Sequence, residues 1–336
     1  KINPKNASDK VPALLEYSCV TQEQLTSVQA VIKVLKGKRN RPLVLTADRG
    51  RGKSSALAIA CGELLKSASK ECALRLIITA ADINSLTVFF SQLATSLPDG
   101  ELQKSKFSVK FGSVEFIAID QLLKKPVDAS LVLVDEAAAI PIYLLEQLLL
   151  NHSRLVFAST IHGYEGAGRG FTLKFQQTLT AKFPKWQSLH LHEPIRWGVN
   201  DPLERLVFEA CLLNAELPNV SVDDQIITPS LLQFKQFSAE ELAGDEQLFK
   251  QVLAVLVTAH YQTKPSDVEM LLDNKQVQLV CLLTEEKAQD ETKQQVVAVA
   301  LLINEGISSC SNIKAEDICA VSQSKRRLKN HFIPQS

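Results

Sequence analysis

The residues best suited to chemistry lie in a glycine- and arginine-rich stretch that follows a short apolar run. The stretch comprises Thr46, Ala47, Asp48, Arg49, Gly50, Arg51, Gly52, Lys53, Ser54 and Ser55. An apolar strand, a glycine-rich turn and a helix in this order are typical of a phosphate-binding loop, in which backbone N–H groups surround phosphate oxygens. In such a loop Lys53 would reach the β- and γ-phosphates of ATP, and the Ser54 hydroxyl would bind Mg²⁺. Ala47 stands where the usual spacing has its first glycine.

Two acidic residues further along the chain supply the second half of this chemistry. Asp135 and Glu136 directly follow the apolar run 131–134, which places both carboxylates at the carboxyl end of an expected strand. We expect Asp135 to hold the Mg²⁺ through water, and Glu136 to orient or deprotonate the water that attacks the γ-phosphate. Acids commonly end strands, but downstream of a Gly-Lys-Ser loop this pair indicates ATP hydrolysis.

Three further side chains are candidate ATP contacts. Gln24 precedes the loop by the distance at which helicase-type ATPases place a glutamine that recognises adenine, and an amide both donates and accepts, as the adenine edge requires. Arg169, in the glycine-dense segment 163–171, and Arg196 are the two candidates for stabilising charge on the γ-phosphate. Each arginine is equally suited to a surface ion pair, so the choice between them stays open.

Two other pairs of polar residues, one of hydroxyl residues and one of histidines, can each be explained by a structural role or by a functional one. The run Phe157–Thr160 ends in two hydroxyl residues, which suit either a γ-phosphate sensor or a plain strand cap. His190 and His192 alternate on one expected strand face. Because no third ligand accompanies them, we expect a structural role and no metal site there.

The elements that must position these residues follow from the apolar pattern. Expected strands cover 43–46, 74–79, 114–119, 131–134 and 154–158, and expected helices cover 21–35, 54–65 and 85–97. Short apolar strands that alternate with helices predict an α/β fold, a parallel sheet with helices on both faces. Ligands of such sheets gather at the carboxyl ends of the strands, where the glycine-rich loop and the two acids both fall.

The second part of the chain has a different pattern. A polar segment at 217–229 predicts a domain junction, and we expect one domain over residues 1–225 and another over 226–336. The second domain begins with an expected strand at 231–237 and helices at 239–242 and 247–261. Two strands, 277–284 and 296–303, then flank a charged turn expected at 285–294, so this domain is antiparallel at its end.

Composition sets bounds on partners and location. Lys+Arg and Asp+Glu both total 37, so any RNA contact must come from a local patch. The two candidate patches, 36–41 and 325–329, each also suit a solvated loop. Seven scattered cysteines without a Cys-x-x-Cys pair favour free thiols in a reducing cytoplasm. No apolar run is long enough to span a bilayer, so we expect no membrane association.

Several longer stretches resemble the bacterial tRNA(Met) cytidine acetyltransferase family. They are residues 47–54, 135–138, 161–171, 193–197, 259–262 and 326–335. The resemblance implies a helicase-like, RecA-like P-loop ATPase joined to an acetyltransferase of the GNAT type. Such an enzyme uses ATP and acetyl-CoA to form N4-acetylcytidine at the wobble position of elongator tRNA(Met). The resemblance also implies that Gln24, the loop through Lys53 and Ser54, and Arg169 contact ATP.

The sequence departs from this family in two places. Thr79-Ala80-Ala81 stands where the family shows Thr-Ala-Pro, and no Gln/Arg-x-x-Gly-x-Gly loop for acetyl-CoA follows Leu231. We therefore expect an ATPase followed by the first half of a GNAT-like α+β domain, which does not acetylate tRNA by itself and has no stable protein partner. One alternative is a free-standing RNA helicase, although only one Walker pair is present. Another is a nucleotide-sensing scaffold that does not hydrolyse ATP, against which Glu136 argues.

Overall fold

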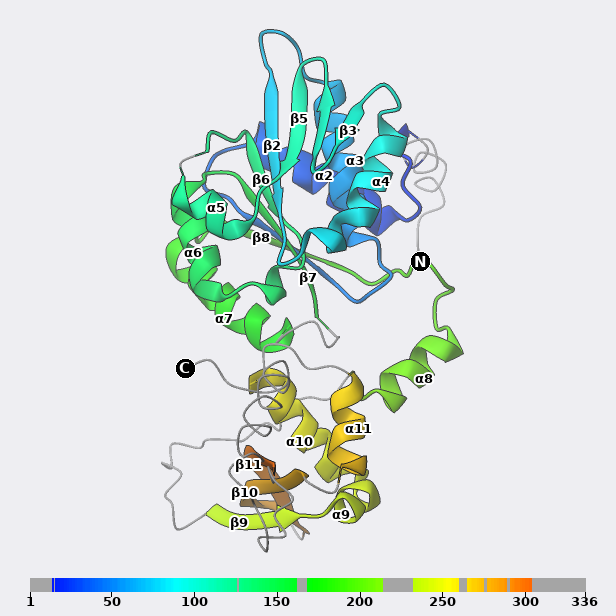
Figure 1. Ribbon diagram of the computed structural model, residues 1–336, viewed down its shortest axis with the longest axis vertical. Coiled ribbons are helices and arrows are strands. Elements are labelled where there is room, and N and C mark those ends of the chain that lie inside the picture. The colour runs from blue at the N-terminus through cyan, green and yellow to red at the C-terminus, as the bar shows by residue number, and fades with distance from the viewer. Residues whose placement is uncertain are drawn as a thin grey trace, which may run out of the picture.

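The computed structural model describes residues 14, 16–125, 127–161, 168–213, 232–259, 265–274, 277–288 and 291–303. Two units of secondary structure lie along this chain, each around its own sheet (Figure 1). The first sheet has eight strands in the order β3-β4-β5-β2-β6-β7-β1-β8. From β5 to β8 in that order the strands pair in parallel, whereas β3 and β4 are antiparallel at one edge. The bounds are β1 Leu43–Ala47, β2 Leu74–Thr79, β3 Glu101–Gln103, β4 Lys106–Val109, β5 Gly112–Phe116, β6 Leu131–Val134, β7 Leu155–Thr160 and β8 Gln187–Leu191.

Helices cover both faces of the parallel sheet, as the sequence predicts. One face carries α2 Gln22–Lys36, α3 Lys53–Lys66 and α4 Thr87–Ser96, and the other carries α5 Ile119–Lys124, α6 Ile142–Asn151 and α7 Gly168–Lys182. Two short 3₁₀ turns, η2 Ile83–Leu86 and η3 Ala137–Ala139, follow β2 and β6. The arrangement confirms the expected fold class, an α/β layer structure around a parallel sheet.

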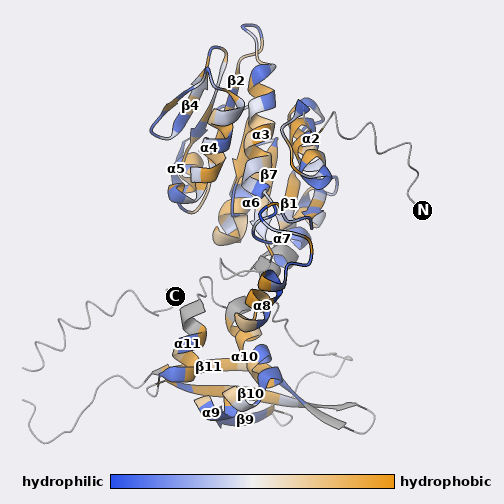
Figure 2. Ribbon diagram, turned by 90° about the vertical axis from the view of Figure 1, so that its right-hand side faces the viewer, coloured by the Kyte–Doolittle hydropathy of each residue, from blue (hydrophilic) through white to orange (hydrophobic). Residues whose placement is uncertain are grey.

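Alternation along the strands explains why both faces are covered. In β1, Leu43 and Leu45 belong to the core beneath α2 and α3, whereas Val44 between them belongs to the core beneath α6 and α7. All five residues of β1 are buried. A strand buried on both faces reads as a continuous apolar run, which is why β1, β6 and β7 are recognisable from sequence. Figure 2 shows apolar residues concentrated in the strands and in the helices packed on them.

The second unit is a smaller antiparallel sheet with helices on it. Its elements are β9 Leu232–Phe237, α9 Ala239–Gly244, α10 Glu246–Ala259, α11 Pro265–Asp273, β10 Val277–Ala288 and β11 Glu291–Ile303, with sheet order β11-β10-β9. Its core includes Phe237, Leu253 and Leu279, together with Leu212, which precedes the expected junction. The expected domain boundary at 225/226 lies outside the described residues and stays a prediction.

The structure corrects three local expectations. The charged segment expected as a turn at 285–294 continues the strands, because β10 runs to Ala288 and β11 begins at Glu291. Cross-strand pairing in a long hairpin therefore outweighs the polar composition that suggested a loop. Strands β3 and β4 lie after α4, where the sequence predicted no strand. The strand expected to run through Ile119 ends at Phe116, and α5 begins at Ile119.

Helix α8, Pro202–Ala210, connects the two units and has no buried residue. It begins at Asp201, whose side chain accepts hydrogen bonds from the backbone N–H groups of Leu203 and Glu204, with Pro202 in the first turn. This is a strong start signal, since an aspartate cap satisfies free N–H groups and proline has none to satisfy. Figure 1 shows α8 on the stretch of chain between the two sheets.

Candidate functional site

The phosphate-binding loop expected from sequence lies at the carboxyl edge of the sheet, between β1 and α3. Gly50 and Gly52 adopt φ values of 77° and 78°, the left-handed region that glycine enters without a steric penalty. Ala47, which replaces the usual first glycine, is the last residue of β1 and pairs with Thr160 and Leu191 on the neighbouring strands. Because Ala47 is an ordinary strand residue, alanine fits there without strain.

Lys53 points back across the loop and joins the two strands that flank the site. Its Nζ donates to Thr160 Oγ1 at 3.0 Å and lies 3.4 Å from the carbonyl oxygen of Ala47. Thr160 Oγ1 in turn lies 3.0 Å from Oε2 of Glu136. Burial lowers the pKa of Lys53, whereas the carboxylates of Glu136 and Asp135 act to raise it. A lysine, a hydroxyl and a carboxylate from three separate segments therefore meet at one point.

Asp135 is positioned as a buried acid beside the start of α3. Its Oδ1 accepts a hydrogen bond from the Glu136 backbone N–H at 3.1 Å, and the nearby Ser54 hydroxyl acts to lower its pKa. Burial, followed by the neighbouring Glu136 carboxylate, raises the pKa of Asp135 to about 6. The other oxygen, Oδ2, is buried and lacks a hydrogen-bond partner among the described residues. An unsatisfied carboxylate oxygen beside a serine hydroxyl is a donor set that fits Mg²⁺.

Glu136 has an unusual backbone for its residue type. Its φ of 48° and ψ of 51° lie in the left-handed region, where residues with a Cβ are uncommon. Such strain persists only where the surroundings hold it, and it concentrates at functional sites. Here the strained residue follows β6 directly and turns its carboxylate toward Thr160 on β7.

Residues after β8 cover the two glycines of the loop. The backbone N–H of Ile195 donates to the Gly50 carbonyl at 2.9 Å, and a Cβ on Gly50 would lie 2.5 Å from the Trp197 ring. A Cβ on Gly52 would lie 2.3 Å from Ile195 Cδ1 and 3.1 Å from Gln24 Nε2. The glycines are therefore needed for space as well as for conformation. Gln24, only 2% exposed, reaches the loop from α2, and its role in recognising adenine stays a prediction.

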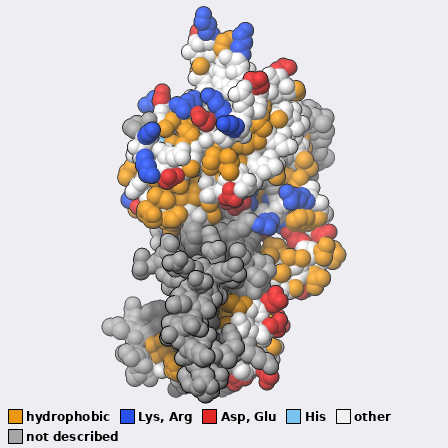
Figure 3. Space-filling model, viewed as in Figure 1, with side chains coloured by type: hydrophobic (Ala, Val, Ile, Leu, Met, Phe, Trp, Pro, Cys, Tyr) orange, Lys and Arg blue, Asp and Glu red, His pale blue; other side chains and the backbone are white. Residues whose placement is uncertain are grey.

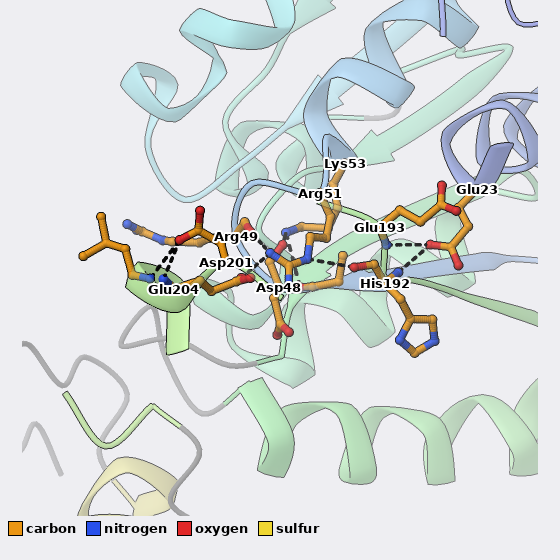
Figure 4. A network of polar contacts seen from close by, with 11 residues as sticks. Glu23, Asp48, Arg49, Arg51, Lys53, His192, Glu193, Asp201 and Glu204 are labelled. Atoms are coloured by element: carbon orange, nitrogen blue, oxygen red, sulfur yellow. Dashed lines mark hydrogen bonds and ion pairs between the residues drawn. The ribbon is translucent and has the colours of Figure 1, made fainter. Parts of the chain in front are cut away.

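Arg51 turns away from the loop and ties it to the following segment (Figure 4). Its guanidinium donates to the carbonyl oxygens of Arg49 and His192 at 3.1 Å each, and it forms an ion pair with Glu204 of α8. On the other side of His192, the Glu23 carboxylate accepts hydrogen bonds from the His192 and Glu193 backbone N–H groups. The loop, α2 and the start of α8 are thus connected through one polar network.

The remaining expected residues lie as follows. Thr46 Oγ1 lies 2.9 Å from His190 Nδ1, and the rings of His190 and His192 contact each other at 4.3 Å between centroids. No group of three or more potential metal ligands occurs among the described residues, and a structural role for the two histidines stays a prediction. Asp48, Arg49 and Ser55 lie within the loop or at the start of α3, with Arg49 exposed.

Of the two arginines that are candidates to stabilise charge on the γ-phosphate, only Arg196 has a described side chain. Arg196 is exposed in the segment after β8, between the residues that cover the loop glycines. Arg169 falls in the first turn of α7, where a loop was expected, and its side chain lies outside the described parts of the chain. The sequence analysis missed Glu204, because contacts between distant segments leave no local pattern. Ile195 and Trp197 belong to the stretch 193–197 that carries the family resemblance, but only the structure shows that they cover the loop glycines.

A parallel sheet with a glycine-rich loop and lysine after one strand, and an Asp-Glu pair after another, defines the class of P-loop ATPases. Comparison with known families narrows this class. Residues 44–214 match the model of the helicase domain of RNA cytidine acetyltransferase NAT10/TcmA, and the chain belongs to that family.

Relatives extend the similarity beyond this domain. The chain is 39% identical over 332 residues to the tRNA(Met) cytidine acetyltransferase TmcA of Vibrio cholerae, a match that covers 96% of the chain and 44% of that protein. It is 36% identical to the protein of the same name from Nitrosococcus halophilus, covering 97% of the chain and 41% of that protein. The chain thus spans less than half the length of these relatives. Among solved structures, the large terminase of a thermophilic bacteriophage in complex with ADP is 11% identical with a TM-score of 0.43, covering 93% of this chain and 75% of that one.

Proposed function

We propose that this chain binds and hydrolyses ATP as the ATPase module of a tRNA(Met) cytidine acetyltransferase. The observation that carries the proposal is the contact chain from Lys53 through Thr160 to the strained residue Glu136, at the carboxyl edge of the sheet. The family match supports the same function, since its model describes a helicase domain.

Each residue of the site has a role that follows from its placement. The backbone N–H groups from Gly50 to Ser54 and the start of α3 would surround the β-phosphate, and Lys53 would exchange its present contact with Thr160 for phosphate oxygens. Released from Lys53, the Thr160 hydroxyl would stay beside Glu136. The Glu136 carboxylate would then orient the attacking water and accept its proton.

Mg²⁺ fits the site at the Ser54 hydroxyl and the unsatisfied Oδ2 of Asp135. When bound, it would neutralise charge on the β- and γ-phosphates. Gln24 would recognise adenine from α2, and Arg196 or Arg169 would stabilise the γ-phosphate; the exposed position of Arg196 close to the loop favours Arg196.

The wider enzyme activity is inferred from the family. The named relatives are tRNA(Met) cytidine acetyltransferases, so we propose that ATP hydrolysis here serves acetylation of a tRNA cytidine, with acetyl-CoA as acetyl donor. ATP would control the position of the tRNA and take no part in acetyl transfer itself. The residues from β9 onward would begin the acetyltransferase domain.

A tRNA partner would place the enzyme in the cytoplasm. Within the described residues, no helix is long and apolar enough to cross a membrane.

A phosphate-release assay tests the ATPase proposal. We expect the wild-type chain to release phosphate from Mg·ATP, faster with tRNA than without, and we expect Lys53→Ala to abolish release while the circular dichroism spectrum stays unchanged. ATP binding without any phosphate release would favour the nucleotide-sensing scaffold instead. Unwinding of an RNA duplex by this chain would favour the free-standing helicase.

A further inference from the structure

Basic side chains gather at the edge of the sheet opposite the loop, where β7, β1 and β8 begin. Three segments lead into these neighbouring strands, residues 36–42, 151–154 and 183–186, and they contain no aspartate or glutamate. We call their Lys and Arg residues the amino-edge cluster: Lys36, Lys38, Arg39, Arg41, Arg154 and Lys185. Figure 3 shows Lys and Arg side chains over the upper part of the molecule, with Asp and Glu side chains among them.

Backbone hydrogen bonds fix the three segments to one another. The N–H of Asn40 donates to the Ser153 carbonyl at 2.8 Å, and the N–H of Gln187 donates to the Pro42 carbonyl at 2.9 Å. The strand register places the amino ends of β7, β1 and β8 side by side, since Leu43 pairs with Val156 on one side and with Gln187 on the other. Neighbouring strands lie about 4.8 Å apart, so the cluster spans roughly 10 Å across the strands before its long side chains extend further.

Among the described residues, none neutralises the charges of the cluster. No member forms an ion pair with another described residue. Lys36, Lys38, Arg39 and Lys185 are exposed, and the buried Nε of Arg154 has no hydrogen-bond partner in the described chain. The nearby acid Glu146 is itself held by Lys182 at 3.0 Å. The next segment along the sheet edge, before β6, adds Lys125 and Asp128 and so no net charge.

This cluster is separate from the nucleotide site. The phosphate-binding loop follows the carboxyl end of β1, whereas the cluster precedes its amino end, and a strand of five residues is about 17 Å long. A nucleotide held at Lys53 therefore cannot contact Lys38 or Arg39. The cluster must meet a different anion.

We propose that the amino-edge cluster binds the phosphate backbone of RNA. Unpaired, exposed lysines and arginines with no intervening acids match a line of phosphates, whose binding depends on charge and releases condensed counterions. An acidic protein partner is less well matched, because protein interfaces rest on apolar anchors. None of the exposed large apolar side chains belongs to the three segments, and Leu150 at the end of α6 is the nearest of them in sequence. The choice of tRNA as probe rests on the proposed function.

Two triple variants test the proposal, one that removes charges from the cluster and one that removes as many charges elsewhere as a control. Lys38→Gln/Arg39→Gln/Lys185→Gln removes three exposed charges from the cluster. Lys104→Gln/Lys106→Gln/Lys110→Gln removes three exposed charges from the β3–β4 edge, at the far side of the same sheet. The affinity of the 336-residue chain for tRNA is measured by fluorescence anisotropy over a series of salt concentrations, and its affinity for Mg·ATP is measured separately.

We expect the cluster variant to bind tRNA about 10-fold more weakly at moderate salt, with a salt slope smaller by about 2, because each lost phosphate contact removes roughly 0.7–0.9 from the slope. The control variant should bind like the wild type. Equal affinities and slopes for all three proteins would overturn the proposal, as would tight binding of poly-glutamate that the cluster variant alone loses. Mg·ATP binding should be the same in all three; its failure in the wild type would refute the ATPase proposal and leave the RNA result to stand separately.

Discussion

At the scale of single residues, the chemistry depends on polar groups that meet from separate strands. Thr160 is the central one, because its hydroxyl contacts both Lys53 on α3 and Glu136 after β6. The sequence showed each residue in its own local motif, and the structure adds that they touch. These contacts support our proposal that Thr160 acts as a γ-phosphate sensor.

Glu136→Gln should separate binding from hydrolysis. The amide keeps the shape of the side chain and cannot accept a proton from water, so we expect phosphate release to fall by about 100-fold or more. The dissociation constant for Mg·ATP should change little, because Glu136 is placed to act on the water. Single-turnover phosphate release together with equilibrium binding checks this. A variant with normal turnover would remove Glu136 from the mechanism.

Gly50→Ala should destabilise the loop, and Gly198→Ala provides its control. An alanine at position 50 would hold a positive φ and would press a Cβ against the Trp197 ring, whereas nothing lies within 4 Å of a Cβ at position 198. The left-handed conformation alone costs a residue with a Cβ roughly 1–2 kcal/mol. We expect urea denaturation to show at least that loss for Gly50→Ala and almost none for Gly198→Ala. Equal stabilities would mean that Trp197 does not pack on Gly50.

At the scale of elements, α8 is connected to the phosphate-binding loop by one ion pair. Arg51 is only 8% exposed, so removal of its Glu204 partner would leave a buried charge with carbonyl acceptors alone. Hydrogen bonds to charged groups contribute about 1.5–3 kcal/mol. The pair is therefore a largely buried polar link between the phosphate-binding loop and α8.

Glu204→Gln tests this link against a matched pair on the same helix. We expect it to lower the free energy of unfolding by about 1–3 kcal/mol, in line with the loss of a charged hydrogen bond. Glu209→Gln, which breaks the exposed pair with Arg205, should cost at most about 0.5 kcal/mol. Denaturant titrations of both variants give the comparison, and hydrogen exchange shows whether α8 amides lose protection. If both variants lose a similarly small free energy of unfolding, Arg51 does not anchor α8 to the loop.

The sequence predicts the bounds of strands well where every residue is buried, and less well where pairing with a neighbouring strand determines how far a strand extends. Strands β1, β2 and β6 match their expected ranges to within a residue, because strands buried on both faces are written as unbroken apolar runs. The hairpin of β10 and β11 was expected to end near Thr284, since charged residues suggest a turn; pairing with the opposite strand carries it to Ala288. For the candidate site, the sequence placed Lys53, Asp135 and Glu136 at one edge of the sheet. The contacts that Glu204 and Trp197 make with the phosphate-binding loop depend on how distant segments pack, which no local pattern shows.

At the scale of the whole molecule, the two units have separate cores, and only the first contains the proposed nucleotide site. A ligand that binds only the folded state stabilises it by about 2.7 kcal/mol at 100 times its dissociation constant. We expect Mg·ATP to slow hydrogen exchange in β1, β6, β7 and α3 and to leave β9, β10 and β11 unchanged. Hydrogen exchange with mass spectrometry measures both regions at once. Protection confined to the antiparallel sheet would place the nucleotide elsewhere.

The most direct test of the account is titration calorimetry of Mg·ATP into the wild-type chain, into Lys53→Ala, and into Lys66→Ala as a control at the exposed end of the same helix. The account predicts one nucleotide bound per wild-type chain, unchanged binding by Lys66→Ala, and binding at least about 10-fold weaker, a loss of about 1.4 kcal/mol, by Lys53→Ala. No heat of binding to the wild type, or equal binding by the Lys53 variant, would contradict it.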